Sequence, residues 1–207
     1  MLSVLISCKS AFALIDTPTL RFSLGYSMVK FGAVGISGQP QFAEGTPIAS
    51  LVTLNPSFLW DVPVLRSRVG IHFLADIGSP FGFISIIGVG ADYVFYPMGL
   101  SSSREVKDDG SVIVKTRISP FFEFKLTPLK MSITDPTVQA AGVTSYFNVL
   151  MVETSIGAGV DYPLTESMIG IVGLHYRFAS FTGESATVGQ VKYSGPILLL
   201  GISANFY

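Results

Sequence analysis

The residues of this chain best suited to chemistry are its two histidines, His72 and His175. A histidine held beside a serine and an acid can activate the serine hydroxyl for nucleophilic acyl transfer. Ser79, Ser180 or Asp76 could lie near one of the two imidazoles. An interior histidine that is hydrogen-bonded to polar neighbours is the more ordinary arrangement, and we expect it here. The sequence therefore predicts no catalytic residues and no enzyme.

Other chemical sites have little support in the sequence. Two histidines and the single cysteine, Cys8, do not make a convincing metal-ligand cluster. The stretch Gly88-Val89-Gly90 lacks the third glycine and the following helix of a phosphate-binding loop. A net charge of −1 argues against a nucleic-acid partner. We expect no metal, no cofactor and no nucleic acid.

A seven-residue stretch that occurs twice indicates how the chain is built. Residues 87–93 read IGVGADY and residues 156–162 read IGAGVDY. Alternation with period 2 predicts strands in which one face is apolar and aromatic and the other carries glycine and aspartate. The pattern recurs so often that the apolar faces have no obvious core to enter. The favoured interpretation is a closed barrel with lipid outside and a polar interior.

Composition supports a membrane barrel. The chain has 207 residues, of which 13% are charged, and its mean hydropathy is +0.55. No run resembles a spanning helix of about 20 apolar residues. The sequence predicts a single all-β domain, an eight-stranded antiparallel up-and-down transmembrane β-barrel. The expected strands are about 20–28, 50–62, 68–77, 81–96, 112–126, 147–162, 167–180 and 190–207.

Connections of different length distinguish the two rims of this barrel. Long loops are expected at 31–49, 127–146 and 181–189, and short turns at 63–67 and 163–166. Short turns are typical of the periplasmic side. The region around Asp109-Gly110 is open between a tight hairpin and a polar turn.

The first residues have the pattern of an export signal. Residues 2–6, LSVLI, form a short, mainly apolar core, and residues 11–13 read AFA, an A-x-A cleavage pattern. We expect residues 1–13 to be the remainder of a signal peptide and residues 14–207 to form the barrel domain. The sequence LISC at 5–8 also fits a lipoprotein box, and a plain N-terminal arm is the third alternative.

Aromatic residues end the expected strands that run toward the short-turn rim. Their rings favour the membrane interface, where the ring is half-buried and its polar edge is hydrated. Chance is the alternative, because 12% of the chain is aromatic. We expect a periplasmic girdle of Trp60, Tyr93, Phe95, Tyr162 and Phe206.

Charged residues on the inward face near the same rim alternate in sign from strand to strand. Adjacent strands lie about 4.8 Å apart, so each charge can reach an opposite charge on its neighbour, and charges shielded from water need such partners. We expect a structural ring, formed by Arg21, Asp61, Arg68, Asp92, Arg117 and Asp161, that seals the periplasmic end. Eight strands enclose a space just wide enough for side chains, so the interior should be largely filled.

The strand ends GVGADY and GAGVDY and the final segment LGISANFY at 200–207 resemble the small eight-stranded bacterial outer-membrane barrels of the OmpW-like, OmpX-like and opacity-type groups. The resemblance covers about residues 18–207. In such barrels the last strand ends on an outward aromatic residue that the assembly machinery reads. Phe206 is in that register, and Tyr207 after it is a departure of one residue.

This resemblance implies a bacterial outer-membrane location, with membrane lipid, lipopolysaccharide and the barrel-assembly machinery as partners. It implies adhesion, membrane anchoring, stress tolerance or narrow passage of small hydrophobic solutes. A protein partner could bind through loops 31–49 and 127–146. Two alternatives remain open: a lipid-modifying barrel enzyme, and a soluble lipocalin-type barrel that keeps its apolar face inside.

Overall fold

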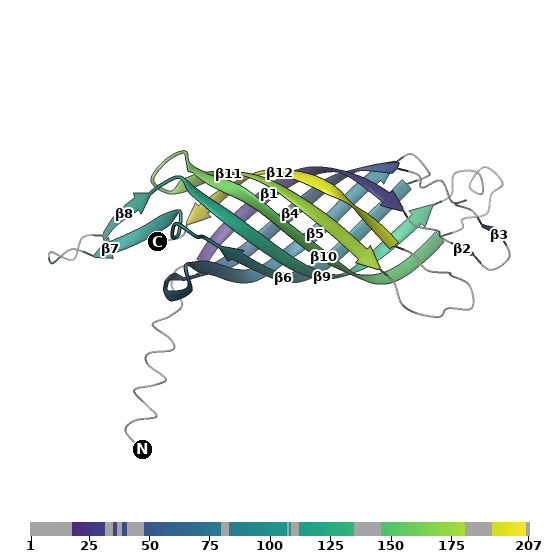
Figure 1. Ribbon diagram of the computed structural model, residues 1–207, viewed down its shortest axis with the longest axis horizontal. Helices are drawn as coiled ribbons and strands as arrows, with labels where there is room; N and C mark the ends of the chain where they lie inside the picture. The colour runs from purple at the N-terminus through teal and green to yellow at the C-terminus, as the bar shows by residue number, and fades with distance from the viewer. Residues whose placement is uncertain are drawn as a thin grey trace, which may run out of the picture.

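Eight long strands form a closed antiparallel barrel in the computed structural model of the chain (Figure 1). The strands are β1 (Pro18–Phe31), β4 (Ile48–Val62), β5 (Ser67–Ser79), β6 (Phe83–Phe95), β9 (Ser119–Thr134), β10 (Tyr146–Pro163), β11 (Met168–Ser180) and β12 (Lys192–Asn205). Their order around the barrel is β1-β12-β11-β10-β9-β6-β5-β4, so each barrel strand lies beside its sequence neighbours and β12 closes on β1. The predicted up-and-down topology is confirmed.

The structure describes residues 18–31, 35–36, 39–40, 48–79, 83–106, 108, 112–134, 146–180 and 192–205. The expected signal peptide, the alternatives for Cys8 and the start of the barrel domain at residue 14 lie outside these ranges, as do Phe206 and Tyr207. Among the described residues, no helix is long and apolar enough to cross a membrane.

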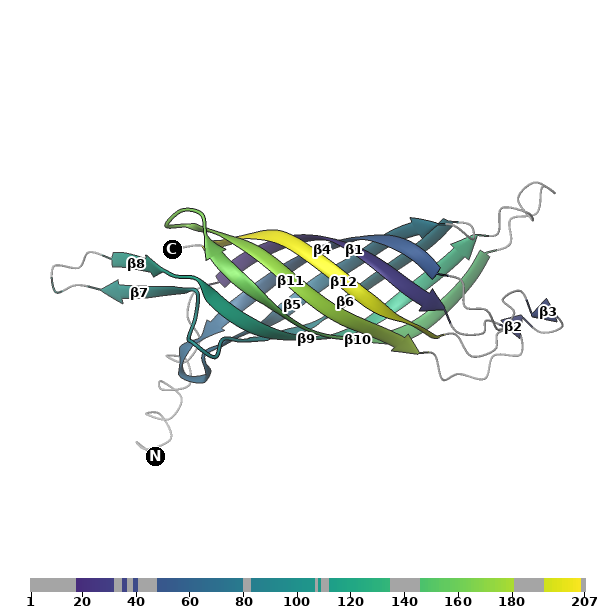
Figure 2. The same cartoon turned by 45° about the horizontal axis from the view of Figure 1, so that its top comes forward.

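The two ends of the barrel differ in their connections. At one end, which we call the turn rim, β1 begins, β12 ends, and the helical turn η1 (Pro63–Leu65) links β4 to β5. At this end the chain between β6 and β9 also forms a hairpin of β7 (Ser102–Val106) and β8 (Val112–Thr116). Figure 2 shows this hairpin extending beyond the barrel. The opposite end, the loop rim, is where β1 ends and β4 begins, and β2 (Gly35–Ile36) pairs with β3 (Gln39–Pro40) between them.

Along most of each barrel strand, buried side chains alternate with half-buried or exposed ones, and the apolar face is the outer one. Leu24, Phe122 and Leu200 are 53%, 57% and 53% exposed. The inward positions beside them are buried, among them Arg21 and Ser23. A soluble ligand-binding barrel would place these groups the other way round. The predicted orientation is therefore confirmed, and the lipocalin-type alternative is wrong, because water does not stabilise such an outer surface and hydrocarbon does.

Two expected boundaries are wrong around β9. Residues 112–116, expected at the start of a barrel strand, form β8 of the hairpin, and the barrel strand begins at Ser119. Residues 127–134, expected in a loop, continue β9, because the inward alternation of Thr127, Leu129 and Met131 persists. The strands that flank residues 109–110 pair as a hairpin, with Val106 opposite Val112, whereas the tight turn considered for those two residues lies outside the described ranges.

The repeated glycine-rich stretch makes room for the two histidines. Gly90 pairs with His72 across β5 and β6, and Gly157 pairs with His175 across β10 and β11. A Cβ atom at Gly90 would lie 2.2 Å from the Leu126 carbonyl oxygen, and one at Gly157 would lie 2.2 Å from Cγ of His175. Both contacts are far too short for a side chain. Glycine on the inward face therefore lets a large ring fit inside a narrow barrel.

Prolines on the outer face interrupt the hydrogen-bond ladder, since proline has no N–H to donate. Pairing of β4 with β5 stops at Leu54 with Ala75 and resumes at Ser57 with His72, so that Pro56 falls in the gap. The side chain of Asn55 compensates, because its Nδ2 donates to the Phe73 carbonyl oxygen at 2.8 Å. Similar gaps occur between β6 and β9 at Pro128 and between β1 and β12 at Pro196.

Candidate functional site

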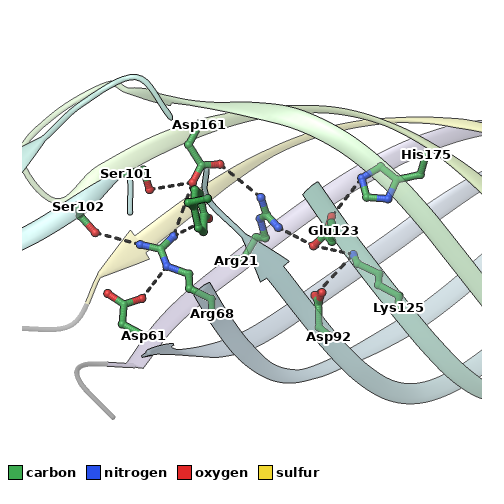
Figure 3. Close-up of polar contacts among 11 residues, drawn as sticks. Arg21, Asp61, Arg68, Asp92, Ser101, Ser102, Glu123, Lys125, Asp161 and His175 are labelled. Atoms are coloured by element: carbon green, nitrogen blue, oxygen red, sulfur yellow. Dashed lines mark hydrogen bonds and ion pairs between the residues drawn. The ribbon is translucent and has the colours of Figure 1, made fainter. Parts of the chain in front are cut away.

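A network of buried charged side chains fills the turn half of the barrel interior (Figure 3). We call it the lower cluster. All its members are at most 6% exposed, and every one lies on an inward position of a barrel strand. Its members are Arg21, Asp61, Arg68, Asp92, Glu123, Lys125, Asp161 and His175.

Arg21 crosses the barrel within this cluster. Its Nη1 donates to Glu123 Oε1 at 2.6 Å, and its Nη2 donates to Asp161 Oδ1 at 3.4 Å. Strands β1 and β9 are four places apart in the eight-strand ring, so Arg21 and Glu123 come from opposite walls. A charged bond of this length is among the stronger hydrogen bonds in proteins. The pair spans the lumen at its level.

The other cations of the lower cluster also have carboxylate partners, several of them on neighbouring strands. Arg68 donates from Nε to Asp61 Oδ1 at 2.6 Å, and its Nη1 lies 3.6 Å from Asp161 Oδ2. Lys125 Nζ lies 3.8 Å from Asp92 Oδ2 and 3.5 Å from Glu123 Oε1. Shared carboxylates therefore join the pairs into one continuous network, which is how buried charges are retained in a protein interior.

The chain beyond β6 enters this network from the turn rim. We call residues 96–102 the rim segment. Tyr96 Oη and Ser101 Oγ each donate to Asp161 Oδ2 at 2.8 Å, and Arg68 Nη2 donates to Ser102 Oγ at 3.0 Å. Burial raises the pKa of the Tyr96 hydroxyl, so this group remains a donor. The sequence analysis missed the rim segment, since nothing in its residue pattern places it inside the barrel.

The predicted ring of six charges needs a correction. Arg21, Asp61, Arg68, Asp92 and Asp161 are buried inside the barrel near the turn rim. Arg117, in contrast, is exposed, and its Nε donates to the Leu100 carbonyl oxygen at 3.0 Å. The reason is that Arg117 precedes β9 and does not share its alternation.

Lys125 takes the place expected for Arg117, opposite Asp92. The contacts also differ from a ring of neighbouring strands, because Arg21 and Arg68 both reach Asp161 across the interior.

A second buried network, the upper cluster, lies nearer the loop rim. Arg177 Nη2 donates to Asp76 Oδ2 and lies 3.0 Å from Glu153 Oε2. Tyr193 Oη donates to Glu153, and Thr53 Oγ1 donates to Asp76. The sequence analysis did not include this cluster. The sequence did indicate that Arg177 points inward, because it lies an even number of residues from the inward residues Ile169 and Ile171 on the same strand.

The space between the two clusters is small. A cavity of about 20 Å³ is bounded by His72 and Lys125 below and by Glu153 and Arg177 above. This volume is about that of one water molecule. The barrel at this level therefore has no room for a broad aqueous path, in accord with the expected filled interior.

The inner wall changes character near the loop rim, where it is apolar. Every barrel strand contributes at least one buried residue to this part, which we call the apolar lining. The residues are Val29, Phe31, Ala49, Leu51, Leu74, Ile84, Ile86, Leu129, Met131, Val149, Met151, Ala179 and Tyr193. The interior was predicted to be polar throughout, so the apolar lining is a correction to the sequence analysis.

Neither Ser180 nor Asp76 is paired with a histidine, and the side chain of Ser79 lies outside what the structure describes. His72 Nε2 lies 2.8 Å from Thr127 Oγ1, and His175 Nε2 lies 3.1 Å from Glu123 Oε2. Ser180 is exposed on the outer face, and Asp76 is paired with Arg177. In the part of the chain that the structure describes, no group of three or more histidine, cysteine, aspartate or glutamate residues could hold a metal ion.

The aromatic residues proposed as a girdle lie on the outer face near the turn rim. Tyr93, Phe95 and Tyr162 are 41%, 36% and 55% exposed. Trp60 follows the same outward alternation and makes an edge-to-face contact with Phe58, with ring centroids 4.8 Å apart. Whether these rings meet a membrane interface stays a prediction.

No protein-family model and no curated protein matches the sequence. Solved structures do. The outer membrane protein OprG from Pseudomonas aeruginosa has 16% identity and a TM-score of 0.57, with 93% of this chain and 97% of that chain covered. Neisserial surface protein A has 13% identity and a TM-score of 0.54, with 90% and 97% covered.

The N-terminal β-barrel domain of Pseudomonas aeruginosa OprF has 14% identity and a TM-score of 0.50, with 93% of this chain and 99% of that domain covered. At these identities the likeness is one of fold. The chain has the fold of the small eight-stranded outer-membrane barrels, as the sequence predicted.

Proposed function

We propose that this chain is an integral outer-membrane barrel whose loop half admits small uncharged hydrophobic molecules, while its charged turn half stays closed to water and ions. The location is supported by the apolar outer face and by the fold. The function rests on one observation, the division of the inner wall into an apolar lining and two charged clusters.

The apolar lining supports a hydrophobic solute over a hydrophilic one. The interior of a membrane barrel is usually polar. Here all eight strands contribute to an apolar inner wall, which favours an apolar molecule inside the barrel. Each apolar group that enters gains roughly 25 cal/mol per Å² of surface removed from water.

The upper cluster forms the floor of this lining and disfavours charged solutes. Arg177 already has two carboxylate partners, Asp76 and Glu153, within the cluster. A charged solute would lose its hydration there without gaining a free counter-charge, which is costly in a buried site. The preferred solute is therefore neutral.

The two clusters also affect where a solute leaves. Passage along the axis would require breaking ion pairs that span the barrel, so an exit through the wall is favoured. The seam between β1 and β12 is the best candidate for such an exit, because its hydrogen-bond ladder is interrupted at Pro196. This gap lies at the level of the upper cluster, since the adjacent residue, Gly195, pairs with Arg177 on β11. On the outer face of this seam an apolar groove of about 510 Å³ runs past Tyr26 and Leu198.

Photolabelling tests the proposal directly. The folded barrel in lipid vesicles is illuminated with a small neutral apolar diazirine, and labelled residues are located by mass spectrometry. Met131 and Met151 face the apolar lining and are at most 4% exposed, whereas Met28 faces outward and is 49% exposed. We expect labelling of all three, and loss of labelling at the two inward methionines alone in Ala179→Trp, which fills the lining.

The matched control places the same substitution on the outer face. Ala91→Trp should leave labelling at all three methionines unchanged, because Ala91 points outward. If the wild-type barrel is labelled at Met28 but at neither inward methionine, the apolar lining is a packed core. The chain would then act as a membrane anchor or adhesin.

A further inference from the structure

The hairpin of β7 and β8 stands outside the barrel at the turn rim, and its described residues form no strand pairing with the barrel. Its two strands pair with each other and form a sheet separate from the barrel. Figures 1 and 2 show it extending past the end of β6 and the start of β9. An isolated two-stranded hairpin is marginally stable in water. Its position must therefore depend on its base.

The base of the hairpin is hydrogen-bonded to the rim segment. Arg117 N donates to the Ser101 carbonyl oxygen at 2.9 Å, and Ser119 Oγ donates to the Gly99 carbonyl oxygen at 2.6 Å. Gly99 has φ of +90°, and a Cβ atom there would lie 2.0 Å from Nη2 of Arg117. The positive φ favours glycine at this position, whereas the guanidinium of Arg117 is the far end of a flexible side chain and could move aside. The chain entering and the chain leaving the hairpin are thus fastened to each other.

The rim segment in turn is fastened inside the barrel. Leu100 packs against an apolar group near the turn rim that includes Leu59 and Phe121. Ser101 is fully buried, and both Ser101 and Tyr96 donate to the same oxygen of Asp161. Asp161 belongs to β10, which is not a neighbour of β6 in the barrel.

We propose that the charged carboxylate of Asp161, inside the barrel, sets the position of the hairpin outside it by accepting hydrogen bonds from the rim segment. We call this set of hydrogen bonds the latch. Asp161 is itself held by Arg21 and Arg68 and has little freedom to follow the segment if it moves. A neutral residue at 161 accepts these hydrogen bonds more weakly, because bonds to a charged acceptor are roughly twice as strong as neutral ones. This inference is independent of the proposed solute.

Cysteine labelling in the folded barrel tests the latch. Cys8 is replaced by serine, and Ser102→Cys, at a position 5% exposed, reports undocking through its reaction rate with a water-soluble maleimide. Ser103→Cys, at an exposed position, gives the rate of a freely accessible thiol. We expect Asp161→Asn to raise the rate at position 102 by about tenfold or more, since a lost charge-assisted hydrogen bond shifts an opening equilibrium by about that factor.

The matched control is Asp76→Asn, which neutralises an equally buried, arginine-paired aspartate of the upper cluster. It should leave the rate at position 102 unchanged. An unchanged rate in Asp161→Asn, or an equal rise in both variants, would overturn the proposal.

A second variant keeps the test decisive if Asp161→Asn does not fold, as judged by heat-modifiable gel migration. Tyr96→Phe with Ser101→Ala removes the donors of the latch and leaves the charges of the barrel in place. We expect the same acceleration at position 102 in this double variant. A rate equal to that of the wild type would contradict the latch.

Discussion

Arg177 on β11 and Asp76 on β5 form an ion pair across the full width of the barrel, between strands four places apart in the ring of eight. Arg21 and Glu123 form a second such pair nearer the turn rim. These two cross-braces account for the closed interior, because each spans the lumen between opposite walls. They also determine which single substitutions should matter.

Removing the upper cross-brace should be costly. Arg177→Met leaves Asp76 and Glu153 buried without their cation, and loss of one partner of a buried pair costs about 3–5 kcal/mol. We expect this fall in the free energy of unfolding, measured by urea titration of the barrel in lipid vesicles. Arg117→Met, at an exposed position, should cost about 1 kcal/mol or less. Equal losses in the two variants would show that Arg117 does have the interior role that the sequence suggested.

The glycine repeat gives a prediction about packing. Gly157→Ala would place a methyl group against the ring of His175 and displace it from Glu123, at a cost of about 1–3 kcal/mol from overpacking. Gly170→Ala is the matched control, since a Cβ atom there meets only ordinary contacts with Leu164 at 3.5 Å. We expect the control to change the free energy of unfolding by about 1 kcal/mol or less. A stable Gly157→Ala barrel would mean that the ring has room to move.

The gap at Pro56 predicts a rescue. Asn55→Ala removes the donor to the Phe73 carbonyl oxygen and one of the three partners of Lys125, and an unsatisfied buried group costs about 1–3 kcal/mol. Pro56→Ala restores a backbone N–H in the gap of the ladder. The double variant should therefore recover about 1 kcal/mol of what Asn55→Ala loses. Strict additivity in a double-mutant cycle would show that the asparagine does not substitute for the missing N–H.

The girdle predicts the depth of the single tryptophan in the membrane. Trp60 lies on the outer face at the turn-rim end of β4, and indole rings favour the interface. In vesicles with lipids brominated at one depth, its fluorescence should be quenched more by bromine near the headgroups than by bromine near the chain ends. The reverse order would place the turn rim in hydrocarbon and remove the girdle.

Period-2 alternation was sufficient to predict the strands and their orientation. Leu24 and Phe122 were placed outward from their parity alone, because a one-residue shift would reverse every side chain of a strand. The same rule failed around Arg117, where a hairpin interrupts the strand. Counting alternate residues predicts the direction of a side chain only within one continuous strand, and Arg117 lies between two strands.

Reasoning from neighbouring strands predicted only part of the pairing inside the barrel, such as Arg68 with Asp61 on the adjacent strand. The predicted ring joined adjacent strands, but a long side chain such as Arg21 or Arg177 extends far enough to meet the opposite wall. Which carboxylate it meets depends on the tilt and stagger of the strands, and these are properties of the closed barrel. The rim segment was missed for a related reason, since its burial depends on a partner distant in sequence.

The cross-braces also bear on the order of events in folding. Arg21 on β1 and Arg177 on β11 cannot meet their cross-barrel partners, Glu123 on β9 and Asp76 on β5, until sheet closure brings the opposite walls together. An open intermediate within hydrocarbon would expose these ions at a cost of several kcal/mol each. Ring closure and dehydration of the charges should therefore occur in one cooperative step, with β1 and β12 joining as the charges leave water.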